Sequence, residues 1–139
     1  MEEGRAYYRQ GDYLRALSEF RPLAEAGNPE AALYLGEYYL HGLAGAKNFA
    51  EALKWYRFAA ARDIPDAQLG LGVMYAAGQG VPRDYVQAYM WLSLCAARLP
   101  AGPDRDRVAA GRDEIAKRMS PESLAEADRR VAAWKPVQQ

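Results

Sequence analysis

The stretch AQLGLGVMYAAGQGVPRDYVQAYMWLSLCAA, residues 67–97, decides the fold because much of it occurs twice. Moving the sequence by 36 residues places it, without a gap, on AALYLGEYYLHGLAGAKNFAEALKWYRFAAA at residues 31–61. A repeat period of this length is typical of helical repeat proteins. The identical pairs are Ala31/Ala67, Leu33/Leu69, Leu35/Leu71, Gly36/Gly72, Tyr39/Tyr75, Gly42/Gly78, Ala52/Ala88, Trp55/Trp91, Ala60/Ala96, Ala61/Ala97 and Arg62/Arg98.

Within each copy the apolar residues follow a helical period in two blocks separated by a loop. In the first block Leu35 and Tyr39 are four residues apart, and Gly42 follows where a glycine C-cap would end a helix. Each copy is therefore predicted to be a pair of helices. The apolar face of the second helix comprises Phe49, Ala52, Tyr56 and Ala59 in one copy and Tyr85, Ala88, Leu92 and Cys95 in the other.

Caps and glycines refine this prediction. Asn48 and Asp84 precede the second helices and are suited to N-cap them. Gly36 and Gly72 lie inside the first helices, where a glycine costs about 1 kcal/mol relative to alanine. A glycine in both copies indicates that another backbone or an aromatic ring approaches the helix closely.

The pattern A-x-x-x-L-G-x-x-Y-x-x-G-x-G-V-x-x-D-Y-x-x-A-x-x-W-x-x-x-A-A resembles the bacterial type of Sel-1-like repeat (SLR), a family of tetratricopeptide-like α-solenoids. Residues 67–97 match it nearly throughout, whereas residues 31–61 have AGA at 44–46 in place of GVP at 80–82. The positions taken as structural in the repeat are Leu35, Gly36, Tyr39, Gly42, Ala52, Trp55, Leu71, Gly72, Tyr75, Gly78, Gly80, Asp84, Ala88 and Trp91.

The N-terminal residues resemble a tetratricopeptide repeat whose loop is about four residues shorter. Pro22 falls inside its second helix and is expected to kink or shorten that helix. The residues with the spacing of that family are Gly4, Tyr7, Gly11, Tyr13, Ala16 and Phe20.

Two further amphipathic segments follow the repeats. One carries Val108, Ile115 and Met119 on a stripe, and the other is opened by Ser120 and Pro121. We predict an all-α, right-handed α/α solenoid of about three helix-turn-helix repeats plus a C-terminal capping helix pair. The expected division of this single domain is 1–29 (tetratricopeptide-like), 30–65 and 66–102 (Sel-1-like), 103–135 (capping helices) and 136–139 (a frayed tail).

Charge and hydropathy exclude some classes of partner. Eighteen basic and eighteen acidic residues cancel, so no net field favours nucleic acid. No apolar run approaches the roughly 18 residues that a membrane span needs. The compartment stays open: a signal peptide trimmed before Met1 would mean a periplasmic or secreted protein, and otherwise we expect a cytoplasmic one.

Catalytic chemistry finds little support in the residues. His41, the only histidine, lacks partners at the spacing of a metal site or a general base. Cys95, the only cysteine, lies on the predicted packing face of a helix. The glycines at 78 and 80 follow a helix, whereas a phosphate loop follows a strand. We therefore expect no catalytic residue, metal or cofactor.

The resemblance implies an adaptor or scaffold that binds a protein or peptide of unknown identity in a concave groove lined by the first helices. Trp55 and Trp91 are interpreted as core or inter-repeat aromatics, and inter-helix packing is favoured for Tyr34 and Tyr38. The groove candidates, carried over position by position, are Arg5, Tyr8, Arg9, Glu37, Leu40, His41, Val73, Ala76 and Ala77.

Two alternatives stay open beside a monomeric, non-enzymatic binding module. Cysteine-rich relatives in the family have been linked to cell-wall or β-lactam ligands, so an enzyme or a cell-wall ligand-binding protein is one alternative. Those relatives carry paired cysteines in each repeat, and this chain has a single cysteine. A self-associating structural module is the other.

Overall fold

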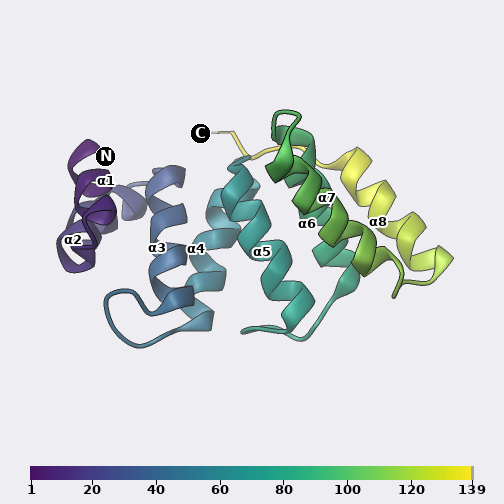
Figure 1. The fold of residues 1–139 in the computed structure, drawn as a ribbon, viewed down its shortest axis with the longest axis horizontal. Coiled ribbons are helices and arrows are strands. Elements are labelled where there is room, and N and C mark those ends of the chain that lie inside the picture. Colours follow the sequence, from purple (N-terminus) through teal and green to yellow (C-terminus); the bar gives the residue numbers. More distant parts are fainter. Residues whose placement is uncertain (139) are drawn as a thin grey trace. The chain divides into compact units, whose positions relative to one another are not determined.

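A computed structural model describes residues 1–138, and these form eight α-helices without a β-strand (Figure 1). The all-α prediction is therefore confirmed. Spatial contacts divide the chain into two units, residues 1–59 and 60–139. The helices are α1 (Glu2–Arg9), α2 (Tyr13–Glu25), α3 (Pro29–His41), α4 (Phe49–Ala61), α5 (Pro65–Ala77), α6 (Tyr85–Arg98), α7 (Pro103–Ala116) and α8 (Pro121–Ala133).

Local sequence signals set the helix ends in the first unit. Asn28 caps α3 by accepting a hydrogen bond from the Ala31 amide at 3.0 Å, with Pro29 in the first turn. Helix α3 ends at Gly42, whose φ of 65° is the left-handed conformation that glycine adopts without strain. Asn48 then accepts from the Glu51 amide at 3.1 Å, which is the N-cap bond expected of it.

The same signals recur in the second unit. Gly78 ends α5 with a φ of 70°, and Asp84 caps α6 by accepting from the Gln87 amide at 3.1 Å. Ser120 caps α8 through a 3.0 Å bond from the Ser123 amide. The loop from Gly78 to Asp84 is thus a connection between two helices.

Each of the first three helix pairs is closed by a glycine that faces a large side chain. A Cβ atom built on the glycine would lie 2.6, 2.8 and 3.0 Å from the facing side chain in the three pairs. The facing residues are 36 positions apart, whereas the first two glycines are only 32 apart, so the first pair has a loop four residues shorter. The pairs are Gly4 with Phe20, Gly36 with Tyr56, and Gly72 with Leu92.

Two expectations need correction. Pro22 does not shorten α2, which continues through the proline to Glu25 and has 13 residues. The C-terminal tail is held at Val137, because the Val137 amide donates a hydrogen bond to the Ala61 carbonyl at 2.8 Å. The last residue of the expected tail, Gln139, lies outside the described residues.

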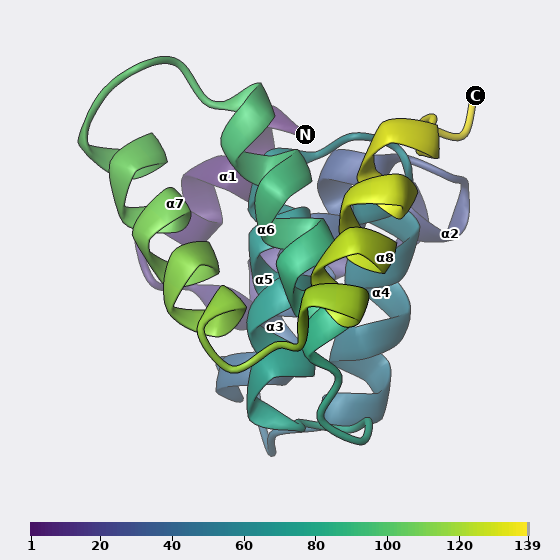
Figure 2. The same cartoon turned by 90° about the vertical axis from the view of Figure 1, so that its right-hand side faces the viewer.

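Helix α6 is the centre of the second unit. It packs against α5, α7 and α8, and it lies between α7 and α8 in Figure 2. Cys95 and Leu92 of α6 form a buried cluster with Val108 of α7. Trp91 meets the ring of Trp134 edge-on at 6.2 Å, which holds the end of α8 against α6. Both terminal helices therefore dock on the last repeat helix.

Candidate functional site

The groove candidates of the first unit come from α1 and α3. Arg9 and His41 are exposed, whereas Tyr8, Glu37 and Leu40 are half-buried. Arg5 is also half-buried: its guanidinium lies 3.3 Å from the Glu30 carboxylate and 3.1 Å from that of Glu2.

Tyr8 lies in a cluster of tyrosine rings. Its ring centroid is 5.4 Å from that of Tyr13, 5.0 Å from Tyr34 and 6.0 Å from Tyr38, all edge-on. Burial, followed by the nearby Glu37 carboxylate, raises the pKa of Tyr8. Tyr34 also stacks on Phe20 at 4.2 Å, so Tyr34 and Tyr38 are packing residues. Tyr8 is thus the partly accessible edge of an aromatic core.

Glu37 connects the two helices of its repeat. Its carboxylate accepts a hydrogen bond from the Tyr56 hydroxyl at 2.7 Å and lies 3.2 Å from Nε2 of His41. The His41 side chain is 54% exposed. Within residues 1–138 no group of three or more His, Cys, Asp or Glu side chains is placed to hold a metal ion. Glu37 and the exposed His41 therefore offer hydrogen-bonding groups for a ligand.

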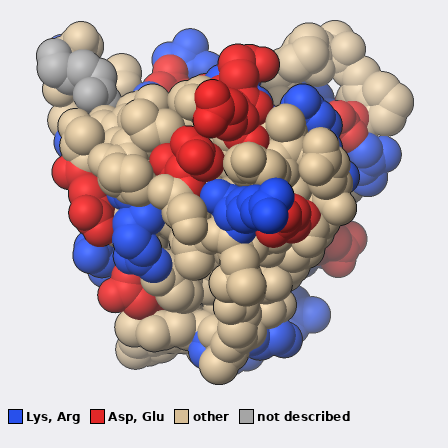
Figure 3. Space-filling model, turned by 90° about the vertical axis from the view of Figure 1, so that its left-hand side faces the viewer, with Lys and Arg blue, Asp and Glu red and all other residues tan. Residues whose placement is uncertain are grey.

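The side of the molecule that carries α1 and α2 is shown in Figure 3. On this side basic and acidic side chains lie next to each other in several places, and most of the remaining surface is uncharged. Arg9 and Arg15 are both exposed, and Arg15 lies 3.5 Å from the Asp12 carboxylate. Mixed charges of this kind favour selective contacts over general attraction of polyanions.

In the second unit, α5 carries the remaining candidates. Val73 is 46% exposed, Ala77 is exposed and Ala76 is half-buried. Leu69 lies four residues before Val73, on the same side of the helix. A cavity of about 390 Å³ adjoins Leu69, and its lining residues are Asp66, Leu69, Cys95, Leu99, Asp104, Arg107 and Val108.

This α5–α7 pocket, as we name the cavity, has an apolar floor and a charged rim. Cys95 at the floor is 1% exposed, and burial, followed by the Asp66 carboxylate, raises the pKa of its thiol to about 11. A thiol that stays protonated is a poor nucleophile. At the rim Asp104 pairs with Arg107, while Asp66 has no ion pair or hydrogen bond among the described residues. The rim therefore carries an excess negative charge.

Sequence reasoning missed this pocket. Leu69 matches Leu33 of the preceding copy, so the repeat alone marks it as structural. Asp104 and Arg107 lie beyond the repeats, in a segment interpreted only as a capping helix. The available signal was the position of Leu69 one helical turn before Val73, which places both residues on one face.

Comparison with known proteins agrees with these features. Residues 29–64 and 65–98 match the Sel1 repeat family. No curated protein matches the chain in sequence. None of the described helices is long and apolar enough to span a membrane.

Two solved structures are similar to the chain. A protective antigen of uropathogenic Escherichia coli with an SLR fold is 29% identical, with a TM-score of 0.84 over 94% of this chain and 28% of that one. A Sel1 repeat protein from Oxalobacter formigenes is 25% identical, with a TM-score of 0.73 over 96% of this chain and 55% of that one. The chain thus spans about a quarter and about half of their lengths. The similarity confirms the predicted α/α solenoid class.

Proposed function

The chain belongs to the Sel1 repeat family, and from that premise we propose that it is a non-enzymatic docking module for a segment of another protein. Sel1 repeats commonly form protein-interaction modules and are typically scaffolds without catalytic activity. In each unit the proposed binding surface is the face of its own first helices, which carries the groove candidates. In the first unit Arg9 and His41 would offer exposed polar contacts, with Leu40 and Tyr8 beside them.

The observation that carries the proposal is the α5–α7 pocket beside an exposed valine. Soluble proteins scatter single exposed apolar residues, but an apolar residue next to a concave apolar floor is typical of an interaction site. Leu69, Leu99 and Val108 can bury an aliphatic side chain of a partner. The unpaired carboxylate of Asp66 can then attract a basic group beside that side chain.

Rigidity adds to the affinity that such a face can reach. The glycine contacts hold each helix pair closely together, so the binding face exists before the partner arrives. A preformed surface loses little conformational entropy on binding. We therefore expect short segments with adjacent aliphatic and basic residues to bind.

A phage-displayed library of random peptides, selected on the full chain, tests the proposal. We expect enrichment of peptides that combine Leu, Ile or Val with Lys or Arg. Val73→Glu should weaken the selected peptides about tenfold, because it places a charge against their apolar side chain. Leu14→Glu is the matched control, since Leu14 is 67% exposed but lies on α2, the second helix of its pair. Equal losses in the two variants would refute the proposed face.

A further inference from the structure

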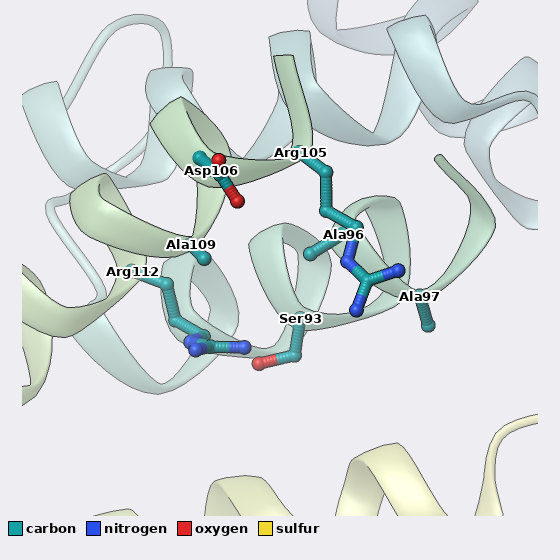
Figure 4. A pocket seen from close by; sticks show the side chains of 7 residues that line it. All are labelled: Ser93, Ala96, Ala97, Arg105, Asp106, Ala109 and Arg112. Carbon is teal, nitrogen blue, oxygen red and sulfur yellow. The ribbon is translucent and has the colours of Figure 1, made fainter. Parts of the chain in front are cut away.

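A second pocket lies on the other side of α7, between that helix and α6 (Figure 4). Its volume is about 400 Å³, at the lower end of the roughly 300–1,000 Å³ typical of ligand sites. From its residues we infer that this α6–α7 pocket binds a carboxylate group presented by a peptide. The lining residues are Ser93, Ala96, Ala97, Arg105, Asp106, Ala109 and Arg112.

Small side chains make room for a ligand here. Ala96 and Ala97 of α6 and Ala109 of α7 line the pocket with methyl groups only. Arg105 and Arg112 are seven residues apart, about two helical turns, and therefore lie on one side of α7. In Figure 4 the two guanidinium groups lie apart, with Ser93 between them in the view. The pocket thus combines an open floor with two donors of the kind that bind carboxylates.

The two arginines differ in whether their guanidinium groups are paired with a carboxylate of the protein. The guanidinium of Arg112 lies 3.1 Å from the Asp113 carboxylate, and its side chain is only 28% exposed. Arg105 is exposed, and among the described residues it has no ion pair or hydrogen bond. Arg105 is consequently the residue with free hydrogen-bond donors. Arg112 also lines the pocket, and its contact with Asp113 fixes its position.

Ser93 adds a polar group at the bottom of the pocket. Its Oγ atom is buried and has no partner at hydrogen-bond geometry, although it lies close enough to the Tyr89 hydroxyl to lower the pKa of Tyr89, which burial raises. A buried hydroxyl without a partner destabilises the free protein. The Oγ atom is covered in the free protein, so a ligand oxygen can accept from Ser93 only when neighbouring side chains shift. Such a shift would remove this cost, so the unpaired hydroxyl favours an occupant with acceptor oxygens.

The balance of charge selects the kind of anion. Asp106 lines the pocket and Asp113 neutralises Arg112, so the four side chains have no net charge. A dianionic phosphate gains little from such a field. A carboxylate needs only one guanidinium edge, which Arg105 can offer through two parallel hydrogen bonds. The ligand chemistry is therefore a single carboxylate, either an acidic side chain or a chain terminus.

Titration of the full chain with blocked tripeptides, followed by amide chemical shifts in NMR spectra, tests this inference. The probes are acetyl-Ala-Glu-Ala-amide, its neutral Gln analogue, and acetyl-trialanine with a free C-terminus. We expect the Glu peptide to bind with a Kd on the order of 1 mM and to shift the amides of Ser93, Ala97 and Ala109. The tighter of the two acidic probes identifies side chain or terminus as the source. Equal binding of the Gln analogue would overturn the inference.

Three variants locate the effect. Arg105→Ala should weaken the Glu peptide about tenfold, whereas Arg118→Ala, which removes an exposed arginine that lines neither pocket, should not. Asp106→Asn should tighten binding about two- to threefold by removing a repelling charge. Equal losses in both arginine variants would mean unspecific attraction, and stronger shifts with inorganic phosphate than with acetate would exclude a carboxylate site. Circular dichroism verifies that each variant is folded.

Ser93→Ala separates binding from a structural role. Because the Ser93 hydroxyl is buried without a partner, its removal should raise the urea midpoint of unfolding while weakening the Glu peptide two- to threefold. Opposite signs of the two changes are what the inference requires. A lower midpoint together with unchanged binding would assign the hydroxyl to the fold alone.

Discussion

Replacing Gly36 by alanine should destabilise the first unit, although alanine is the better helix former. The added Cβ would lie 2.8 Å from two carbon atoms of the Tyr56 ring, about 1 Å closer than a normal carbon–carbon contact. The ring has no room to move away, because Tyr56 is fully buried and its hydroxyl is bound to Glu37 at 2.7 Å.

The expected size follows from two opposing contributions. Overpacking a well-filled core costs about 1–3 kcal/mol, and the held ring favours the upper half of that range. The gain in helix propensity is about 1 kcal/mol. The net loss in the free energy of unfolding is therefore about 1–2 kcal/mol. Gly111→Ala is the matched control, since no atom lies within 4 Å of its added Cβ, and it should stabilise by about 1 kcal/mol.

Urea unfolding followed by far-UV circular dichroism measures both variants. With a slope of about 1–3 kcal/mol per molar urea, the Gly36→Ala midpoint should fall by roughly 1 M while that of Gly111→Ala rises. Tyr56→Leu should relieve Gly36→Ala in a double-mutant cycle, because Leu92 occupies the corresponding place opposite Gly72. A Gly36→Ala midpoint at or above that of the wild type would refute the close-packing explanation.

Three further outcomes can be measured. The pKa of Cys95 is raised from 9.0 to about 11, so the protonated thiol should contribute its full stability below pH 9 and lose it as the pH rises through 11. Urea titrations of the wild type and of Cys95→Ala at several pH values measure this contribution. Asp84→Ala should cost about 1 kcal/mol, since the Gln87 amide loses its cap, and a midpoint unchanged in urea would contradict this. Trp134→Ala should lower the melting temperature by several degrees through loss of the Trp91 contact; an unchanged calorimetric transition would argue against that contact.

The repeat predicts much of the fold because its signals are local. Asn48 and Asp84 act on amides three residues ahead, and Gly42 ends a helix through its own φ, so these features can be read from short segments. Pro22 shows the limit of local reasoning, since α2 continues through it to Glu25 although proline is a poor helix former.

The pockets depend on contacts between distant segments. Val108 packs beside Cys95, and this contact sets how α7 lies on α6 and therefore which α7 residues face each pocket. Nothing in the 36-residue period specifies it, because α7 lies beyond the repeats. The groove candidates on α1 and α3 could be placed on their helices from the sequence. The sequence could not predict that Arg5 pairs with Glu30 or that Glu37 accepts a hydrogen bond from Tyr56.

The hydrogen bond from Val137 to Ala61 has a consequence for how the second unit unfolds. Helical repeats ordinarily make contacts only with their sequence neighbours, so their ends can melt one helix at a time. This bond joins positions 76 residues apart (137 minus 61) and thus raises the contact order of the unit. It ties the end of the chain to the residues just before α5. We therefore expect residues 61–137 to exchange their amide protons as one cooperative block, without progressive opening from the C-terminal helix.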